Sequence, residues 1–150
     1  MKKAAVTMAA IMLCLGLAVN VFAESATKEE CIAKSKEAAQ MINEKGLDAA
    51  VAEINKKDGK FVWKDTYVFL MDLDGKMLGH PMKPDLNGKN LMGSMDKAEK
   101  GKEKMLFKEF VDLAKSKGEG WVDYMWPKPG EEKPSKKISY IYRVRGRNFS

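Results

Sequence analysis

Residues 67–81 constrain this chain most, because their pattern predicts a β-hairpin. The first part is rich in aromatic and branched side chains, which suit a half-buried strand. Asp74 and Gly75 form a tight-turn pair, since glycine adopts positive φ without steric cost. A short return strand follows, and Pro81 ends it because proline donates no ladder hydrogen bond. The hairpin therefore ends on His80, the only histidine in the chain.

The first 23 residues predict a cleaved secretory signal peptide. Two lysines precede an almost unbroken apolar run, and the small side chains of Val21 and Ala23 mark a cleavage site before Glu24. An uncleaved membrane anchor is the alternative, because about 20 apolar residues can span a bilayer. Residues 24–150 then form one periplasmic domain, with room for a single hydrophobic core.

The charge pattern argues against nucleic-acid binding. The net charge is +6, but basic and acidic side chains are mixed and no basic stripe alternates with aromatic residues. Only Cys31 remains after cleavage, so no internal disulfide can form and the domain must be held by packing. Its helical spacing from apolar positions predicts burial as a small hydrophobe rather than reactivity.

The chemistry-bearing residues favour binding over catalysis. A single histidine without a cysteine partner, and no recognisable carboxylate pair, provide no catalytic set, so the sequence predicts neither an enzyme nor a cofactor. The abundant methionines offer an alternative function. The sulfurs of Met82, Met92 and Met95, close in sequence to His80, would suit copper(I) in a periplasmic metal-handling protein.

The rest of the pattern separates helices from strands. Residues 27–30 have the form of a capping box, which begins a helix that runs to about residue 45. A second helix is predicted over residues 47–54, and a third begins at residue 106, after a long polar connection at 81–104, and stops at Gly118. The predicted strands are residues 66–72, 76–80, 120–126 and 137–144. This order predicts an antiparallel sheet with helices packed on it, in the α+β class.

Several motifs together resemble the single Cache domain family, whose members are PAS-like extracytoplasmic sensor domains of chemoreceptors, histidine kinases and free periplasmic proteins. The order and spacing of the motifs carry the resemblance, which extends over residues 24–149. The motifs are residues 67–75, His80 with Pro81, Gly88 to Leu91, Phe107 to Phe110, Gly118 to Tyr124, Trp126 with Pro127, and Lys137 to Tyr140.

The resemblance implies a PAS-like antiparallel sheet, with a long N-terminal helix packed on one face and a small pocket on the other. The family usually continues beyond a position like Phe149 into a last strand between the first and fourth strands. Here the chain stops at Ser150, so the last strand is expected to be missing and the domain to be incomplete at its C-terminus. An open strand edge favours pairing with another chain, which predicts a homodimer formed by strand exchange.

The resemblance also implies a function. Small Cache domains typically bind short carboxylates such as acetate, propionate, lactate or pyruvate. We therefore expect a periplasmic binding module for a short organic anion, which acts in signal transduction and chemotaxis without catalysis. Its expected partner is a separate membrane receptor or kinase.

His80 and Lys137 are the predicted carboxylate ligands. An imidazole at the strand end would donate a hydrogen bond to the carboxylate, although a purely structural histidine is an equal alternative. The resemblance places Lys137 beside the same anion, although most lysines at such positions are simply solvated.

Four aromatic residues complete the predicted site: Tyr67, Trp121, Tyr124 and Tyr140. Their rings would supply apolar walls and their polar tips hydrogen bonds, the mixture expected of a small-ligand site. Side chains alternate along a strand, so Trp121 and Tyr124 lie on opposite faces and at most one of them can face the pocket. The sequence leaves open which one does.

Overall fold

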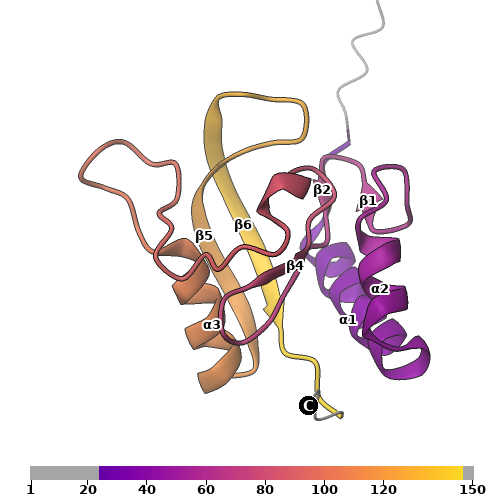
Figure 1. The fold of residues 1–150 in the computed structure, drawn as a ribbon. Coiled ribbons are helices and arrows are strands. Elements are labelled where there is room, and N and C mark those ends of the chain that lie inside the picture. Colours follow the sequence, from indigo (N-terminus) through magenta and orange to yellow (C-terminus); the bar gives the residue numbers. More distant parts are fainter. Residues whose placement is uncertain (1–23, 147–150) are drawn as a thin grey trace, which may run out of the picture.

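A computed structural model describes residues 24–146 (Figure 1). Its helices are α1 (Lys28–Lys45), α2 (Leu47–Ile54) and α3 (Leu106–Ser116), with a 3-10 helix at Pro84–Leu86. Its strands are β1 (Val62–Trp63), β2 (Thr66–Tyr67), β3 (Leu70–Met71), β4 (Met77–Gly79), β5 (Glu119–Pro127) and β6 (Pro134–Tyr142). The predicted signal peptide and chain end lie outside the described residues. Within residues 24–146, no helix is long and apolar enough to cross a membrane.

The first two helices confirm the sequence signals that predicted them. The Thr27 hydroxyl accepts a hydrogen bond from the Glu30 amide at 3.2 Å, and the Glu30 carboxylate accepts one from the Thr27 amide at 2.9 Å. This reciprocal pair is the predicted capping box. α1 ends at Gly46, which has a positive φ of 90° that few other residues adopt. α2 starts directly after this glycine.

The predicted hairpin at residues 67–81 is present, and specific contacts of Asp72 and Gly75 hold its turn. One carboxylate oxygen of Asp72 accepts hydrogen bonds from the amides of Asp74 and Lys76, at 3.0 and 2.8 Å. Gly75 has a φ of 87°, and the Met92 side chain packs so closely on it that a Cβ there would lie 2.2 Å from Met92 Cγ. The turn therefore requires glycine both for its conformation and for this contact.

The strands form three antiparallel pairs rather than the single four-stranded sheet that the sequence predicted. The predicted first strand is divided into β2 and β3, and β2 pairs with β1 in a hairpin that the sequence did not reveal. In the described residues no ladder joins β6 to β2 or β3. The α+β class is nevertheless confirmed, because helices and antiparallel strands remain segregated along the chain.

The hydrophobic core has two parts, which lie on opposite sides of Figure 1. We call the first the aromatic half; it joins α3 to β4, β5 and β6, and its buried residues are Met77, Leu91, Leu106, Phe107, Phe110, Ala114, Val122, Tyr124, Trp126 and Ile141. We call the second the helical half; it joins α1, α2 and the residue before β1, and its buried residues are Ala38, Ile54 and Phe61. The hairpin of residues 67–81 runs between the two halves.

The long connection at residues 81–104 is held against the rest of the fold. The Gly88 amide donates to the Met77 carbonyl at 2.7 Å, and the Met77 amide donates to the Lys89 carbonyl at 3.0 Å. Leu91 is buried in the aromatic half. The segment therefore extends β4 on its second edge instead of forming a free loop.

Cys31 corrects one prediction from the sequence. Its side chain is half-buried rather than buried on a core face. Partial burial, together with the nearby carboxylates of Glu30 and Asp65, raises the pKa of its thiol. The thiolate fraction is therefore low at neutral pH, in agreement with the predicted lack of reactivity.

Candidate functional site

A small cavity lies where the hairpin meets α3 and β5. Its volume is about 10 Å³, which is room for about one water molecule. Three of the predicted site residues, Tyr67, His80 and Tyr124, share its lining. Five apolar or aromatic side chains complete the wall: Phe69, Leu106, Phe107, Phe110 and Trp126. The cavity thus combines a mostly apolar wall with a few polar tips, as small-ligand sites do.

His80 is fixed in one tautomer. Its side chain is 3% exposed, and its Nδ1 accepts a hydrogen bond from the Lys83 amide at 3.0 Å. A neutral imidazole that accepts at Nδ1 carries its proton on Nε2. Burial, and then the nearby positive charges of Lys137 and Lys83, lower the pKa of His80 to about 4, so the ring is neutral at pH 7. Nε2 is therefore the nitrogen that can donate to a ligand.

The backbone of His80 is held from the helical half. Its amide donates to Oδ1 of Asn55 at 3.0 Å, and the same oxygen accepts from the Asn87 amide group at 2.9 Å. Asn55 directly follows α2, and Gly79 lets β4 approach this helix end, because a Cβ there would lie 3.3 Å from Ile54. The position of His80 thus depends on both halves of the fold.

Two tyrosines line the same cavity. The Tyr67 ring lies 4.8 Å from the His80 ring, and burial raises the pKa of its hydroxyl. Burial also raises the pKa of Tyr124 to about 12, and its hydroxyl is hydrogen-bonded to the Ser139 hydroxyl at 2.7 Å. Both tyrosines are therefore neutral at physiological pH and can donate hydrogen bonds without adding negative charge.

Lys137 stands at the edge of this group rather than in the cavity wall. Its Nζ lies 4.1 Å from the centroid of the Tyr67 ring. Burial lowers the pKa of Lys137 to about 8, although Asp65 and Cys31 oppose this shift. No carboxylate lies within 4 Å of its ammonium in the described part of the chain. The ammonium is thus positively charged at pH 7 and has no partner anion in that part of the chain.

Trp121 and Tyr140 lie on the other face of the β5–β6 pair. They are direct cross-strand partners with ring centroids 5.2 Å apart. The Tyr140 hydroxyl donates to the Glu119 carboxylate, and the Lys28 ammonium lies 5.4 Å from the Trp121 ring. Trp121 and Tyr124 thus lie on opposite faces, as strand alternation predicted, and the structure shows that Tyr124 is the one that lines the cavity. The structure does not bring Trp121 or Tyr140 to the other site residues.

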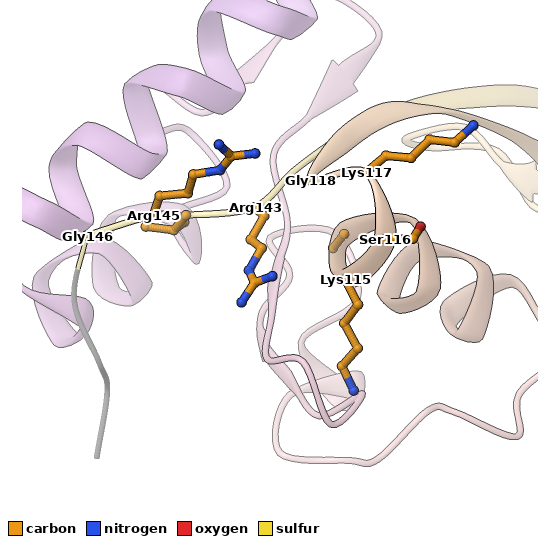
Figure 2. Close-up of a pocket in the computed structure, with 9 residues that line it drawn as sticks. Lys115, Ser116, Lys117, Gly118, Arg143, Arg145 and Gly146 are labelled. Carbon is orange, nitrogen blue, oxygen red and sulfur yellow. The ribbon is translucent and has the colours of Figure 1, made fainter.

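A larger hollow, of about 510 Å³, lies between the end of α3 and the residues after β6 (Figure 2). Lys115, Lys117, Arg143 and Arg145 line it. Figure 2 shows that the two guanidinium groups point away from each other and that the two lysines also diverge. The lysines lie at the helix C-terminus, where positive charge complements the helix dipole. This cleft therefore has charge but no converging donors, and the smaller cavity is the better candidate.

The sequence did not identify most of the cavity wall. Phe69, Phe107, Phe110 and Trp126 stood within the motifs, but nothing in their local pattern distinguished a cavity wall from ordinary core packing. Among the described residues, no group of three His, Cys, Asp or Glu side chains could hold a metal ion. Met92 of the predicted copper site instead packs on the Gly75 turn.

Comparison with known proteins agrees with this architecture. The chain is 39% identical over 77 residues to the methyl-accepting chemotaxis protein McpP of Pseudomonas putida, a match that covers 51% of this chain and 13% of that protein. The chain thus corresponds to a small part of the length of this relative. This relative is a chemotaxis protein and gives no support to the alternative of a periplasmic copper-handling function.

Solved structures give a similar picture. One, described as the periplasmic sensor domain of a chemotaxis protein, superposes with a TM-score of 0.59 at 29% identity, over 77% of this chain and 79% of that one. Another, from work on carboxylic acid recognition by a Cache chemosensory domain, has a TM-score of 0.53 at 30% identity, over 75% and 76%. A methyl-accepting chemotaxis protein from Vibrio parahaemolyticus shares the fold, with a TM-score of 0.58 at 24% identity, over 74% and 75%.

The family assignment rests on most of the chain. Residues 29–149 match the profile of the Cache domain. That span includes both halves of the core, the hairpin and every residue of the candidate cavity. The chain therefore belongs to the Cache domain family, as the motifs of its sequence had indicated.

Proposed function

We propose that this Cache domain is a periplasmic sensor module that binds a short organic anion of the acetate, propionate, lactate or pyruvate class. The observation that carries the proposal is the neutral, buried His80, whose Nε2 carries the proton and whose side chain lines a cavity shared with two neutral tyrosines. The ammonium of Lys137 lies beside Tyr67. Donors and positive charge without a competing carboxylate favour an anion.

Each of these residues has its own role in binding the carboxylate. His80 Nε2 and the hydroxyls of Tyr67 and Tyr124 donate hydrogen bonds to the carboxylate, while Lys137 supplies the opposite charge. The apolar rings exclude water, which strengthens each of these interactions. A relative studied for carboxylic acid recognition by a Cache domain supports this class of ligand. No bond is made or broken, so the module acts through binding alone.

The proposed output is a change passed to a separate membrane receptor or kinase. The similarity to chemotaxis receptors supports such a partner.

Export with cleavage before Glu24 remains a prediction of the sequence, and N-terminal sequencing of the exported protein tests it. A protein that retains Met1 in the membrane fraction would contradict the predicted cleavage.

Titration calorimetry with acetate, propionate, lactate and pyruvate tests the binding proposal. Lys137→Met should weaken binding of the best ligand by about tenfold to a hundredfold, because charge-assisted hydrogen bonds contribute about 1.5–3 kcal/mol. Lys136→Met is the matched control, since Lys136 is exposed on the other face of β6. Both Lys136→Met and Trp121→Phe should leave the affinity unchanged, because Trp121 too lies on the face away from the cavity. Equal affinities for the Lys137 and Lys136 variants would remove Lys137 from the site.

A further inference from the structure

Four positively charged side chains surround the hollow at the end of α3 (Figure 2). Lys115 and Lys117 come from the last turn of this helix and its C-cap, and Arg143 and Arg145 come from the segment after β6. All four side chains are exposed, and we call them the basic patch. The patch shares no lining residue with the candidate cavity, so it is a separate feature of the surface.

Contacts between distant segments hold the backbone of the basic patch. The Arg143 amide donates to the Gly118 carbonyl at 2.7 Å, directly after α3. The side-chain amide of Asn43 in α1 donates to the Arg145 carbonyl at 3.2 Å. A Cβ at Gly118 would lie 2.6 Å from Nη2 of Arg145, so this guanidinium packs against the glycine. The tertiary structure therefore brings the four charges together, because α1, α3 and the segment after β6 each contribute a contact.

Carboxylates of the described chain do not neutralise the basic patch. Among residues 24–146, none of its four positive groups has a carboxylate oxygen within 4 Å. The acidic residues nearest in sequence to the end of α3 have other partners. Asp112 is paired with Lys108, and Glu119 accepts a hydrogen bond from Tyr140. Like charges that lie close together repel each other, so external anions would stabilise the patch.

The directions of the four side chains decide which kind of anion fits the patch. A site for one small anion needs polar groups that converge on it. In Figure 2 the two guanidinium groups point away from each other, and the two lysines also diverge. Diverging positive groups can each meet a different negative group. The basic patch therefore fits a broad surface on which negative groups repeat side by side, rather than a single small anion.

The composition of the hollow favours a lipid surface over a protein or a nucleic acid. Apart from its glycines, Ala114 and Val144 are the only nonpolar residues in its lining, and none of the lining residues is aromatic. Protein interfaces need a desolvated apolar centre and are depleted in lysine. Sites for single-stranded nucleic acids use aromatic rings to stack the bases. Anionic phospholipids require neither feature, because lysine and arginine bind their headgroups through charge alone.

We infer that the basic patch is a docking surface for anionic phospholipid headgroups, and that it holds the domain against a membrane by the end of α3. The attraction is electrostatic and reversible, since no apolar anchor enters the bilayer. Docking does not depend on the proposed ligand, because patch and cavity have no residue in common. It would concentrate the domain at the surface where the proposed membrane receptor lies.

Flotation of the exported chain with lipid vesicles tests this inference. The wild type should float with vesicles of equal parts phosphatidylglycerol and phosphatidylcholine but not with pure phosphatidylcholine, and added salt should release it because salt screens exposed charges. Lys115→Gln with Arg143→Gln should weaken binding to the anionic vesicles by about tenfold or more. The control is Lys89→Gln with Lys100→Gln, which removes the same net charge from exposed positions outside the patch. It should bind like the wild type.

Three results would overturn the docking surface. Equal losses in the patch and control variants would show that net charge alone drives binding. Wild-type binding that does not depend on phosphatidylglycerol, or no binding at all, would remove the attraction to anionic lipid. Release by soluble glycerol phosphate, at the same phosphate concentration as the vesicles, would show that the patch binds single phosphates rather than a surface.

Two further measurements separate docking from folding and from ligand binding. The melting temperature of the patch variant should equal that of the wild type, because both substituted side chains are exposed. Its affinity for the best carboxylate in calorimetry should also be unchanged. Loss of vesicle binding with normal carboxylate binding supports the docking surface, whereas failure of the wild type to bind any carboxylate counts against the proposed function alone.

Discussion

The aromatic half and the helical half are held together in different ways. The aromatic half has ten buried hydrophobic residues, whereas the helical half has three. In the aromatic half, Phe110 contacts the rings of Phe69, Phe107 and Tyr124 at centroid distances of 5.4, 5.8 and 5.5 Å. The helical half depends more on local signals, such as the capping box and the glycine between its helices. The larger cluster should therefore carry most of the cooperative stability.

The candidate site lies in the aromatic half, but contacts with the helical half fix its position. The ring of His80 packs with Tyr67 and Phe69, while its backbone is bound by Asn55 at the end of α2. A ligand that contacts His80 therefore touches a residue to which both halves are attached.

The largest expected effect tests the aromatic half. Phe110→Ala should lower the free energy of unfolding by about 3–5 kcal/mol, because it leaves a void among packed aromatic rings. Urea denaturation measures this loss. Phe61→Ala, in the helical half, is the comparison: it should increase hydrogen exchange in α1 and α2 while β5 stays protected. Equal loss of protection throughout the chain in both variants would show that the halves unfold as one unit.

A second prediction concerns the joint between the halves. The pKa of His80 is about 4 in the folded state, below its ordinary value of 6.5, because burial disfavours the imidazolium. Below pH 6.5 the unfolded chain takes up a proton that the folded chain does not, so stability falls as the pH drops. Between pH 6.5 and about pH 5 the loss should be about 2 kcal/mol.

Urea denaturation at several pH values measures this dependence. His80→Gln should flatten it in that interval, because glutamine does not titrate. If the wild type and His80→Gln lose the same stability over this range, His80 would not be buried as a neutral ring.

The smallest predicted effect concerns the start of α1. Thr27→Ala should lower the free energy of unfolding by about 1 kcal/mol, because the Glu30 amide loses its acceptor. Hydrogen exchange should rise in the first turn of α1 and remain unchanged in β5. Glu30→Gln is the control, since glutamine can complete the capping box. If Thr27→Ala also increased hydrogen exchange across the aromatic half, the effect of the capping box would not be local to the helical half.

Much of the fold was accessible from the sequence because its signals are local. The capping box, Gly46 and the period of apolar residues gave α1 and α2, and the Asp74–Gly75 pair gave the hairpin turn. The sequence also predicted Tyr67, His80 and Tyr124, which do lie together in one cavity. The sequence did not show that the first strand is interrupted or that β1 pairs with β2, because both depend on the neighbours of short segments.

The sequence alone determined the three α-helices, the hairpin turn, the two long strands, the family and the opposite orientation of Trp121 and Tyr124, because periodicity, capping and turn chemistry act over a few neighbouring residues. Only the tertiary structure decided that Tyr124 is the one at the cavity and that His80 is neutral with its proton on Nε2. It also decided that Lys83 and Lys97 both lie beside the ring of Trp126. Burial and contact between segments far apart in the chain set these properties, and no local pattern encodes them.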